Sequence, residues 1–422
     1  MKKSAERGGL PRAARALLAA VFVDALGSGL YLAVSVVFLT RYLDLGSSEV
    51  GLGLGVAGAV SFALLVPTGI LADRAGPRTM LIAAHLTRAA LLACYPFASG
   101  FVPFLLVVSL LAVADRAASP LVQGMFGAAV GSGQRVRAMG MARSLQNLGL
   151  SLGGLAAAGA LLWDSDGVYL AVVHGNALSF VLAAALVARL PAGQGGGRPL
   201  PWKRRLAVLR DRRFAALTVL NSVVSLHVTV LTVGIPLWVL AHDELPRSVI
   251  AWTLVLNTVL VVLFQVRATR GTGSAEDGGR ALRLSGLLLA AGCCALAATG
   301  ELATAWAVTV LLAAVAFQAF AEMHQQAGAW AISYDLAPGD RRQVYLSFFS
   351  LGNAARNTYG PLVVTFLVVQ RGAVGWLLLG ALALGCGAWA ARAGRPSTAS
   401  GAQHAPPLSL TDVQGETHGT HP

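Results

Sequence analysis

Charged residues are scarce in this chain of 422 residues. Asp, Glu, Lys and Arg make up 12% of the sequence, whereas they form roughly a quarter of an ordinary soluble domain. Hydrophobic residues make up 56%, and the mean hydropathy is +0.67. This composition excludes a globular protein dissolved in water, because such a fold could not bury so much apolar surface.

Cysteine is also rare, and the four cysteines show no metal-ligand spacing. All of them lie in apolar segments, which favours core packing over disulfide bonds or metal binding: Cys94, Cys293, Cys294 and Cys386. The sequence has no H-E-x-x-H or G-x-x-x-x-G-K-S/T motif, which mark zinc proteases and nucleotide-binding loops. We therefore expect no catalytic residues, no metal, no cofactor and no enzymatic activity.

Long apolar stretches recur along the chain. A helix needs about 20 apolar residues to cross roughly 30 Å of hydrocarbon. Twelve stretches are long enough, with approximate cores at residues 16–40, 50–71, 79–98, 102–127, 138–162, 168–189, 214–240, 248–266, 282–299, 303–333, 344–369 and 373–391. The sequence therefore predicts an all-α membrane protein with twelve transmembrane helices. The first stretch is too long for a cleavable signal peptide and is expected to remain as an anchor.

Basic residues are distributed unevenly between the predicted loops. The net charge of +13 could favour nucleic acid as a partner, but the placement of the 32 Lys and Arg residues favours a topology signal. If both termini are cytoplasmic, 26 of them lie on the cytoplasmic side, three lie in outer loops, and three lie within spans, namely Arg88, Arg116 and Arg356. We therefore expect a multi-pass protein of the bacterial inner membrane that contacts lipid, has both termini in the cytoplasm and binds no nucleic acid.

The predicted spans divide into two groups of six. Residues 1–189 are expected to form the first bundle, 190–213 a cytoplasmic linker, 214–392 the second bundle, and 393–422 a disordered cytoplasmic tail. An offset of 206 residues aligns spans 5 and 11 and pairs Gly133 with Gly339, Arg135 with Arg341, Ser144 with Ser350, Leu145 with Leu351, Asn147 with Asn353 and Gly154 with Gly360. This indicates two pseudo-symmetric six-helix bundles, although chance similarity between helices rich in small residues would also give such matches.

The loop between spans 2 and 3 carries the most specific motif in the chain. It begins at Gly69, continues through Asp73, Arg74 and Gly76, and includes Arg78. This segment resembles the major facilitator signature G-x-L-A-D-R-x-G-x-R at each defining position. The resemblance implies a monomeric transporter with a substrate site between its halves, in which Asp73 contacts the motif arginines and the start of span 11 to close the cytoplasmic side. A generic basic turn is the alternative.

Two further segments match the family only in part. Arg116 lies where the family often has a cavity arginine, but the expected R-x-x-Q-G pattern is not intact, since Gln123 and Gly124 follow one turn later. In span 5, Gly149, Gly153, Gly154 and Gly159 resemble the antiporter signature G-x-x-x-G-P-x-x-G-G, with glycine in place of its proline. This resemblance favours export by antiport, whereas close packing of helices would explain the same glycines.

Ionised side chains within the spans indicate a structural or functional role, because inserting one at the centre of a membrane-spanning helix costs about 2.5 to 3.5 kcal/mol. Asp24 lies on a polar stripe with Ser28 and Tyr31, which we expect to face a cavity. The offset of 206 residues places Arg116 opposite Glu322. We hypothesise that Asp24 and Glu322 carry protons in one central cavity, and that Arg116 is a fixed positive charge there. A permanent structural ion pair is the alternative.

Other polar residues within the spans could contact a substrate. Asn147 of span 5 and Asn353 and Arg356 of span 11 are the candidates, although hydrogen bonds between helices would also explain them. Asp115 is expected to point away from the cavity, because it is about 100° from Arg116 on the helix. The sequence favours proton-coupled export of small amphipathic compounds, as in drug or natural-product efflux. Proton symport of a small nutrient and a transport-inactive sensor are the alternatives.

Overall fold

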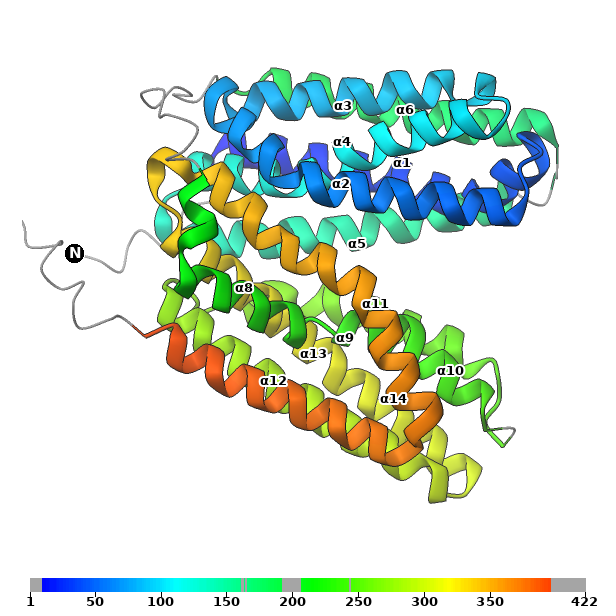
Figure 1. Cartoon of the computed structure of the whole chain (residues 1–422), viewed down its shortest axis with the longest axis vertical. Coiled ribbons are helices and arrows are strands. Elements are labelled where there is room, and N and C mark those ends of the chain that lie inside the picture. The colour runs from blue at the N-terminus through cyan, green and yellow to red at the C-terminus, as the bar shows by residue number, and fades with distance from the viewer. Residues whose placement is uncertain (1–9, 161–162, 164, 192–205, 243, 396–422) are drawn as a thin grey trace, which may run out of the picture.

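The computed structural model describes residues 10–160, 163, 165–191, 206–242 and 244–395. Within these ranges the chain forms helices and contains no strand (Figure 1). The predicted all-α fold is confirmed. Most of the expected linker and tail, at 192–205 and 396–422, lies outside the described residues.

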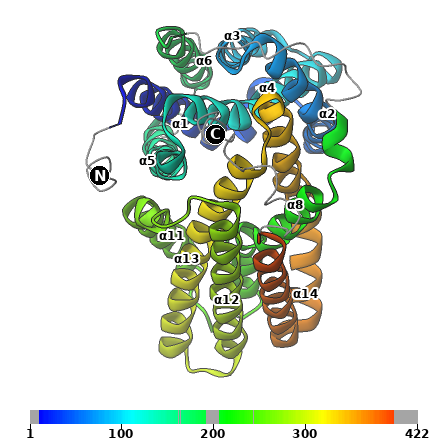
Figure 2. The same cartoon turned by 90° about the vertical axis from the view of Figure 1, so that its left-hand side faces the viewer.

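The first six spans form one bundle. Their bounds are α1 Arg12–Val37, α2 Ser47–Ala75, α3 Pro77–Cys94, α4 Phe101–Ala129, α5 Arg135–Ala160 and α6 Asp166–Ala188. Helix α1 packs against both α5 and α6, while α4 packs against α2 and α3. Helices α2 and α5 contact α14 and α11 of the second half, whereas α3 and α6 lie on the far side of the first bundle (Figure 2).

The second group contains one interrupted span and one long helix that holds two spans. Its helices are α8 Arg212–Val224, α9 His227–Thr229, α10 Ile235–Leu240, α11 Val249–Ala268, α12 Ala275–Ala298, α13 Thr304–Leu336 and α14 Arg342–Ala393. Helices α8, α9 and α10, with a π-helical turn, make up the predicted seventh span. Helix α14 contains the last two predicted spans, because the chain bends at Gly372, whose φ of 54° suits glycine.

Among the residues that the structure describes, ten of the twelve predicted spans are long and apolar enough to cross a membrane. The other two are α5 and the first part of α14, up to about residue 369. Both carry arginine and asparagine side chains that lower their hydropathy. These two helices also correspond in the internal repeat. The helices that precede them, α4 and α13, end at Ala129 and Leu336, 207 residues apart, close to the predicted offset.

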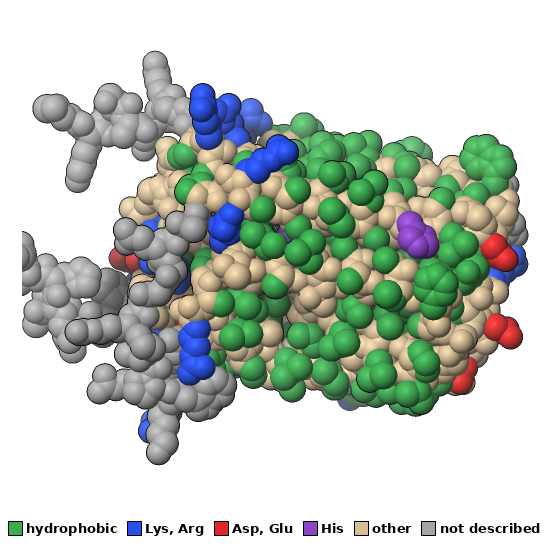
Figure 3. Space-filling model, turned by 90° about the horizontal axis from the view of Figure 1, so that it is seen from above, with side chains coloured by type: hydrophobic (Ala, Val, Ile, Leu, Met, Phe, Trp, Pro, Cys, Tyr) green, Lys and Arg blue, Asp and Glu red, His purple; other side chains and the backbone are tan. Residues whose placement is uncertain are grey.

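The two ends of the molecule differ in charge. Hydrophobic side chains cover its middle on the face shown in Figure 3, most Lys and Arg side chains lie toward the left end, and several Asp and Glu side chains lie at the right end. We call the left end, where α2 ends and α3 and α14 begin, the basic end. The two bundles approach each other there and diverge toward the right (Figure 1).

Glycines on α5 allow a close contact between α5 and α1. A Cβ added to Gly153 would lie 2.1 Å from the carbonyl oxygen of Leu26, and one added to Gly149 would lie 2.9 Å from Cβ of Ala25. Gly154, by contrast, has no neighbouring atom within 4 Å of such a Cβ. Packing between helices is therefore a sufficient explanation for Gly149 and Gly153.

Substitution of these glycines tests the contact. We expect Gly153→Ala to lower the midpoint of thermal unfolding in detergent, because the new methyl group must push α1 away at a cost of about 1 to 3 kcal/mol. Gly154→Ala is the matched control, since its methyl group enters open space, and it should leave the midpoint unchanged. Equal midpoints for the two variants would contradict the close contact.

Candidate functional site

A cavity of about 620 Å³ lies between the two bundles. Residues from α1, α2, α3, α4 and α5 line it on one side, and residues from α9, α13 and α14 line it on the other. Its volume lies within the range of small-molecule pockets. Its wall combines charged and amide side chains with apolar ones, among them Val122, Met139, Leu150 and Trp330.

One side of the cavity holds an arginine shared by two carboxylates. The two terminal nitrogens of Arg88 donate to the carboxylate of Asp24 at 2.6 and 3.3 Å. One of these nitrogens lies 3.3 Å from the carboxylate of Asp115. Arg88 is 2% exposed, and its guanidinium lies 3.7 Å from the centre of the Phe180 ring. Asp24 and Asp115 are 20% and 65% exposed, so both carboxylates remain accessible from the cavity.

The sequence analysis gave Arg88 no role and expected Asp115 to point away from the cavity. The second expectation is wrong, because both Asp115 and Arg116 line the cavity. The cavity wall covers enough of the α4 surface to include two consecutive residues. The central position of Arg88 in its span, similar to that of Asp24, was the available signal for this pair.

Glu322 lies in a second ion pair, which joins the two bundles. A terminal nitrogen of Arg143 on α5 donates to Glu322 of α13 at 2.8 Å. Asn257 and Gln326 also donate to this carboxylate, at 3.4 and 3.1 Å. Glu322 is 3% exposed and does not itself line the cavity, whereas Arg143 does.

The expected group of Asp24, Arg116 and Glu322 is therefore not assembled as proposed. Asp24 and Arg116 line the same cavity, but the partner of Asp24 is Arg88, and the partner of Glu322 is Arg143. Arg143 was counted among the cytoplasmic arginines, because it lies near the start of its span. Its long side chain reaches the cavity from there.

The remaining predicted cavity residues divide into two groups. Asn353 and Arg356 line the cavity, and Arg356 donates two hydrogen bonds to the side-chain oxygen of Asn357, at 2.6 and 3.2 Å. Tyr31 and Asn147 are not part of its wall. Tyr31 lies in an aromatic cluster, with its ring 6.4 Å from that of Tyr95. The polar stripe on α1 therefore faces the cavity only at Asp24 and Ser28.

The signature motif joins the bundles at the basic end. The carboxylate of Asp73, near the end of α2, accepts hydrogen bonds from the backbone N–H groups of Gln343 and Val344 at 2.9 and 3.2 Å. These groups belong to the first turn of α14, where backbone donors are free and the helix dipole favours an anion. The predicted contact between Asp73 and the start of span 11 is present.

Other residues of the motif shape the turn between α2 and α3. Gly76 has a φ of 84°, which glycine adopts without strain. Gly69 lies so close to α14 that an added Cβ would be 2.4 Å from the hydroxyl oxygen of Ser347. Arg78 donates to the backbone carbonyl of Ala188 on α6, and Arg74 is exposed. Arg78 therefore holds the turn against its own bundle.

Contacts between α4 and α13 close the basic end further. Gln123 donates to the hydroxyl of Ser333 at 2.7 Å, and the hydroxyl of Tyr334 donates to the backbone carbonyl of Gln123. The guanidinium of Arg135 lies 5.8 Å from the centre of the Tyr334 ring. The sequence analysis noted Gln123 only as a departure from a family pattern and missed Ser333 and Tyr334, since nothing in their spacing indicates a partner on another helix.

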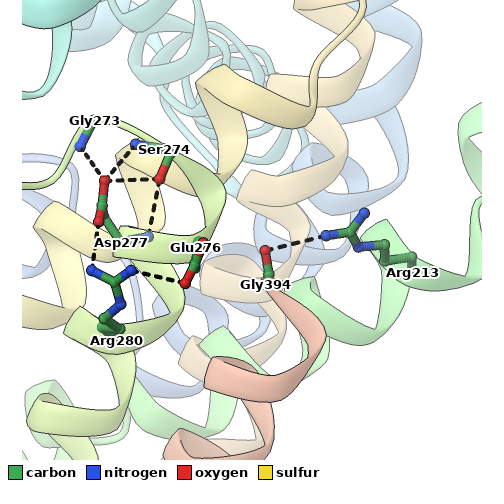
Figure 4. A network of polar contacts seen from close by, with 7 residues as sticks. All are labelled: Arg213, Gly273, Ser274, Glu276, Asp277, Arg280 and Gly394. Atoms are coloured by element: carbon green, nitrogen blue, oxygen red, sulfur yellow. Dashed lines mark hydrogen bonds and ion pairs between the residues drawn. The ribbon is translucent and has the colours of Figure 1, made fainter. Parts of the chain in front are cut away.

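The corresponding loop of the second bundle makes local contacts instead. Ser274 and Asp277 form a capping box at the start of α12, and Arg280 pairs with Glu276 and Asp277 at 2.8 and 3.0 Å (Figure 4). Nearby, Arg213 donates to the carbonyl of Gly394 beyond the end of α14. Within the described part of the chain, each of these contacts stays inside the second bundle.

Several solved structures share this fold. A variant of the E. coli fucose:proton symporter FucP is 14% identical with a TM-score of 0.66, and the alignment covers 91% of this chain and 98% of that one. A bacterial homologue of the iron transporter ferroportin, in an outward-facing state, is 16% identical with a TM-score of 0.73 and coverages of 91% and 98%. The human organic anion transporter MFSD10 (TETRAN) is 15% identical with a TM-score of 0.67 and coverages of 91% and 100%.

At these identities the similarity shows a common fold and leaves the substrate open. Among curated proteins, no sequence matches this chain significantly. The sequence profile of the Major Facilitator Superfamily, however, matches residues 17–308, which is more than half of the chain. The chain therefore belongs to the Major Facilitator Superfamily, and it is a membrane transporter rather than an enzyme.

Proposed function

We propose that this protein exports small amphipathic compounds across the bacterial inner membrane in exchange for protons. The observation that carries the proposal is the cavity between the bundles, whose wall holds Asp24 and Arg143, the partner of Glu322. Buried ionisable groups beside a cavity in a membrane protein are typical of proton and substrate pathways. Apolar wall residues such as Met139 and Trp330 suit an amphipathic cargo.

The orientation follows from the basic end. Lys and Arg favour the cytoplasmic side of a membrane protein, so we assign the basic end and both termini to the cytoplasm. The closing contacts of Asp73 and Gln123 then lie on the cytoplasmic side of the cavity. In this assignment the protein faces outward, and residues 1–189 and 214–392 are the two units that rock against each other during transport.

The Asp73 contact is the proposed cytoplasmic gate. We expect Asp73→Asn to shift the protein toward the inward-facing state by roughly tenfold, because hydrogen bonds to a charged acceptor contribute about 1.5 to 3 kcal/mol. Spin labels at the exposed positions Ala75 and Asp340, in a variant without the four native cysteines, would report a longer distance.

Glu49→Gln is the matched control for this measurement. Glu49 accepts a hydrogen bond from the backbone of Gly46 in its own helix turn, at the end of α2 away from the gate. Its removal should leave the distribution of label distances unchanged. An Asp73→Asn variant with the same distribution as the parent would remove the gate from the proposal.

Asp24 and Glu322 are the proposed proton carriers. Each is held by one arginine, so a proton on the carboxylate would free that arginine and alter the polar contacts around it. Glu322 also accepts hydrogen bonds from two side-chain amides, which would hold the carboxylate in one orientation while it is ionised. The alternative is that both pairs are permanent structural salt bridges between helices.

Proton flux separates these two interpretations. We expect Asp24→Asn and Glu322→Gln each to abolish proton movement that a gradient of exported compound drives through proteoliposomes, since neither amide titrates. A pH-sensitive dye inside the vesicles measures this flux while a panel of small amphipathic compounds is tested. Glu301→Gln, outside the cavity at the end of α12, should retain it. Wild-type proton flux in both Asp24→Asn and Glu322→Gln would favour permanent structural ion pairs instead.

The proposal also specifies the direction in which the compound moves relative to protons. The similar structures include a protein named as a proton symporter, so the fold is compatible with symport as well as with the proposed antiport. Export by antiport is supported by the resemblance of span 5 to the antiporter signature. Movement of protons opposite to the compound supports export, and movement of both in the same direction supports nutrient symport.

A further inference from the structure

Four arginines line the cavity, and two of them are already neutralised. Arg88 pairs with Asp24 and Asp115, and Arg143 pairs with Glu322. The other two are Arg116 on α4 and Arg356 on α14. Within the part of the chain that the structure describes, no carboxylate lies within 4.0 Å of either guanidinium.

The local contacts of these two arginines leave their charges unbalanced. Arg356 donates to the amide oxygen of Asn357, which is a neutral acceptor. Asp115 is next to Arg116 in sequence, but its carboxylate lies against Arg88. Among the described residues, the cavity and its immediate surroundings hold four positive and three negative groups, namely Arg88, Arg116, Arg143 and Arg356 against Asp24, Asp115 and Glu322.

An unbalanced arginine inside a membrane is costly, and its partner is normally another charge or water. A guanidinium presents five donors in a planar fork that matches carboxylate, sulfonate and phosphate oxygens. Arg116 belongs to the first bundle and Arg356 to the second. Both line the same cavity, so an anionic group held by the two arginines would contact both halves of the protein there.

We propose that the transported compound carries an anionic group, bound between Arg116 and Arg356, with its apolar part against Trp330 and Met139. This inference rests on the transport function proposed above and narrows its substrate to organic anions. The two arginines bind the anion directly, while Asp24 and Glu322 keep their separate partners. The cavity volume accommodates a ring system together with the anionic group.

Equilibrium binding to the purified full-length protein tests the charge preference without any need for transport. The probe is radiolabelled 2-naphthoate, and the competitors are 2-naphthamide and 2-naphthylmethylammonium, which have similar size but no negative charge. We expect unlabelled naphthoate to compete at least tenfold better than either one, because only the anion forms charge-assisted hydrogen bonds with both arginines. Equal competition by the amide, or no saturable naphthoate binding, would overturn the inference.

Substitutions locate the site. Arg116→Gln and Arg356→Gln should each weaken naphthoate binding by about tenfold to a hundredfold, whereas Arg356→Lys, which keeps the charge but loses the fork, should have a smaller effect. Arg371→Gln is the matched control, since Arg371 lies outside the cavity beside Phe366. Unfolding midpoints show whether each variant is folded, and the wild-type competition series needs no variant.

The two proposals fail separately in this design. Selective naphthoate binding that depends on both arginines, together with an absence of proton-coupled flux, would refute the proposed transport mechanism and leave the anion site standing. Proton-coupled flux of neutral or cationic compounds with unchanged activity in Arg116→Gln and Arg356→Gln would refute the anion site and leave the transport mechanism standing.

Discussion

A charge inside a membrane must meet an opposite charge or water, and this requirement organises the centre of the protein. Arg88 satisfies two carboxylates at once and thereby ties α3 to α1 and α4. Arg143 reaches from α5 to Glu322 on α13 and joins the bundles at the level of the cavity. Because an unpaired group would cost several kcal/mol, these ion pairs restrict how the helices can rotate about their own axes.

The apolar packing supports this polar centre. Glycines bring α5 and α1 into backbone contact, which places the polar faces of both helices at the cavity. At the basic end the bundles are joined by hydrogen bonds to a helix terminus and by side-chain contacts between α4 and α13. Apolar side chains meet there too, since Val66 and Ile70 of α2 share a buried cluster with Val344 and Phe349 of α14, so opening must separate apolar as well as polar contacts.

The sequence was sufficient for the fold and for part of the site. Hydropathy located the twelve spans, since the length of an apolar helix is set by the bilayer, and the motif around Asp73 identified its contact with the start of span 11. The repeat correctly related α4 and α5 to α13 and α14. These features depend on local composition or on spacing along one helix, which can be read directly from the sequence.

The pairing of charges across helices could not be read in the same way. Periodicity places Asp24 on a polar face but does not say which neighbouring helix supplies its partner, so Arg88 was left without a role. The same limit led to Arg116, rather than Arg143, as the expected neighbour of Glu322. Tyr31 was placed at the cavity because it shares a stripe with Asp24, but the aromatic cluster around Tyr95 holds it elsewhere.

The two central ion pairs differ in how a relative movement of the two bundles would affect them. Asp24 and Arg88 both belong to the first bundle and move together with it. The environment of this pair therefore changes mainly with what the cavity contains. The pair of Glu322 and Arg143 joins the two bundles, so any relative movement of the bundles alters the distance between these two side chains. An ionised carboxylate whose counter-ion is withdrawn becomes costly to keep in hydrocarbon. Relative movement of the bundles would therefore change the contact of Glu322 with Arg143 directly and leave the contact of Asp24 with Arg88 intact.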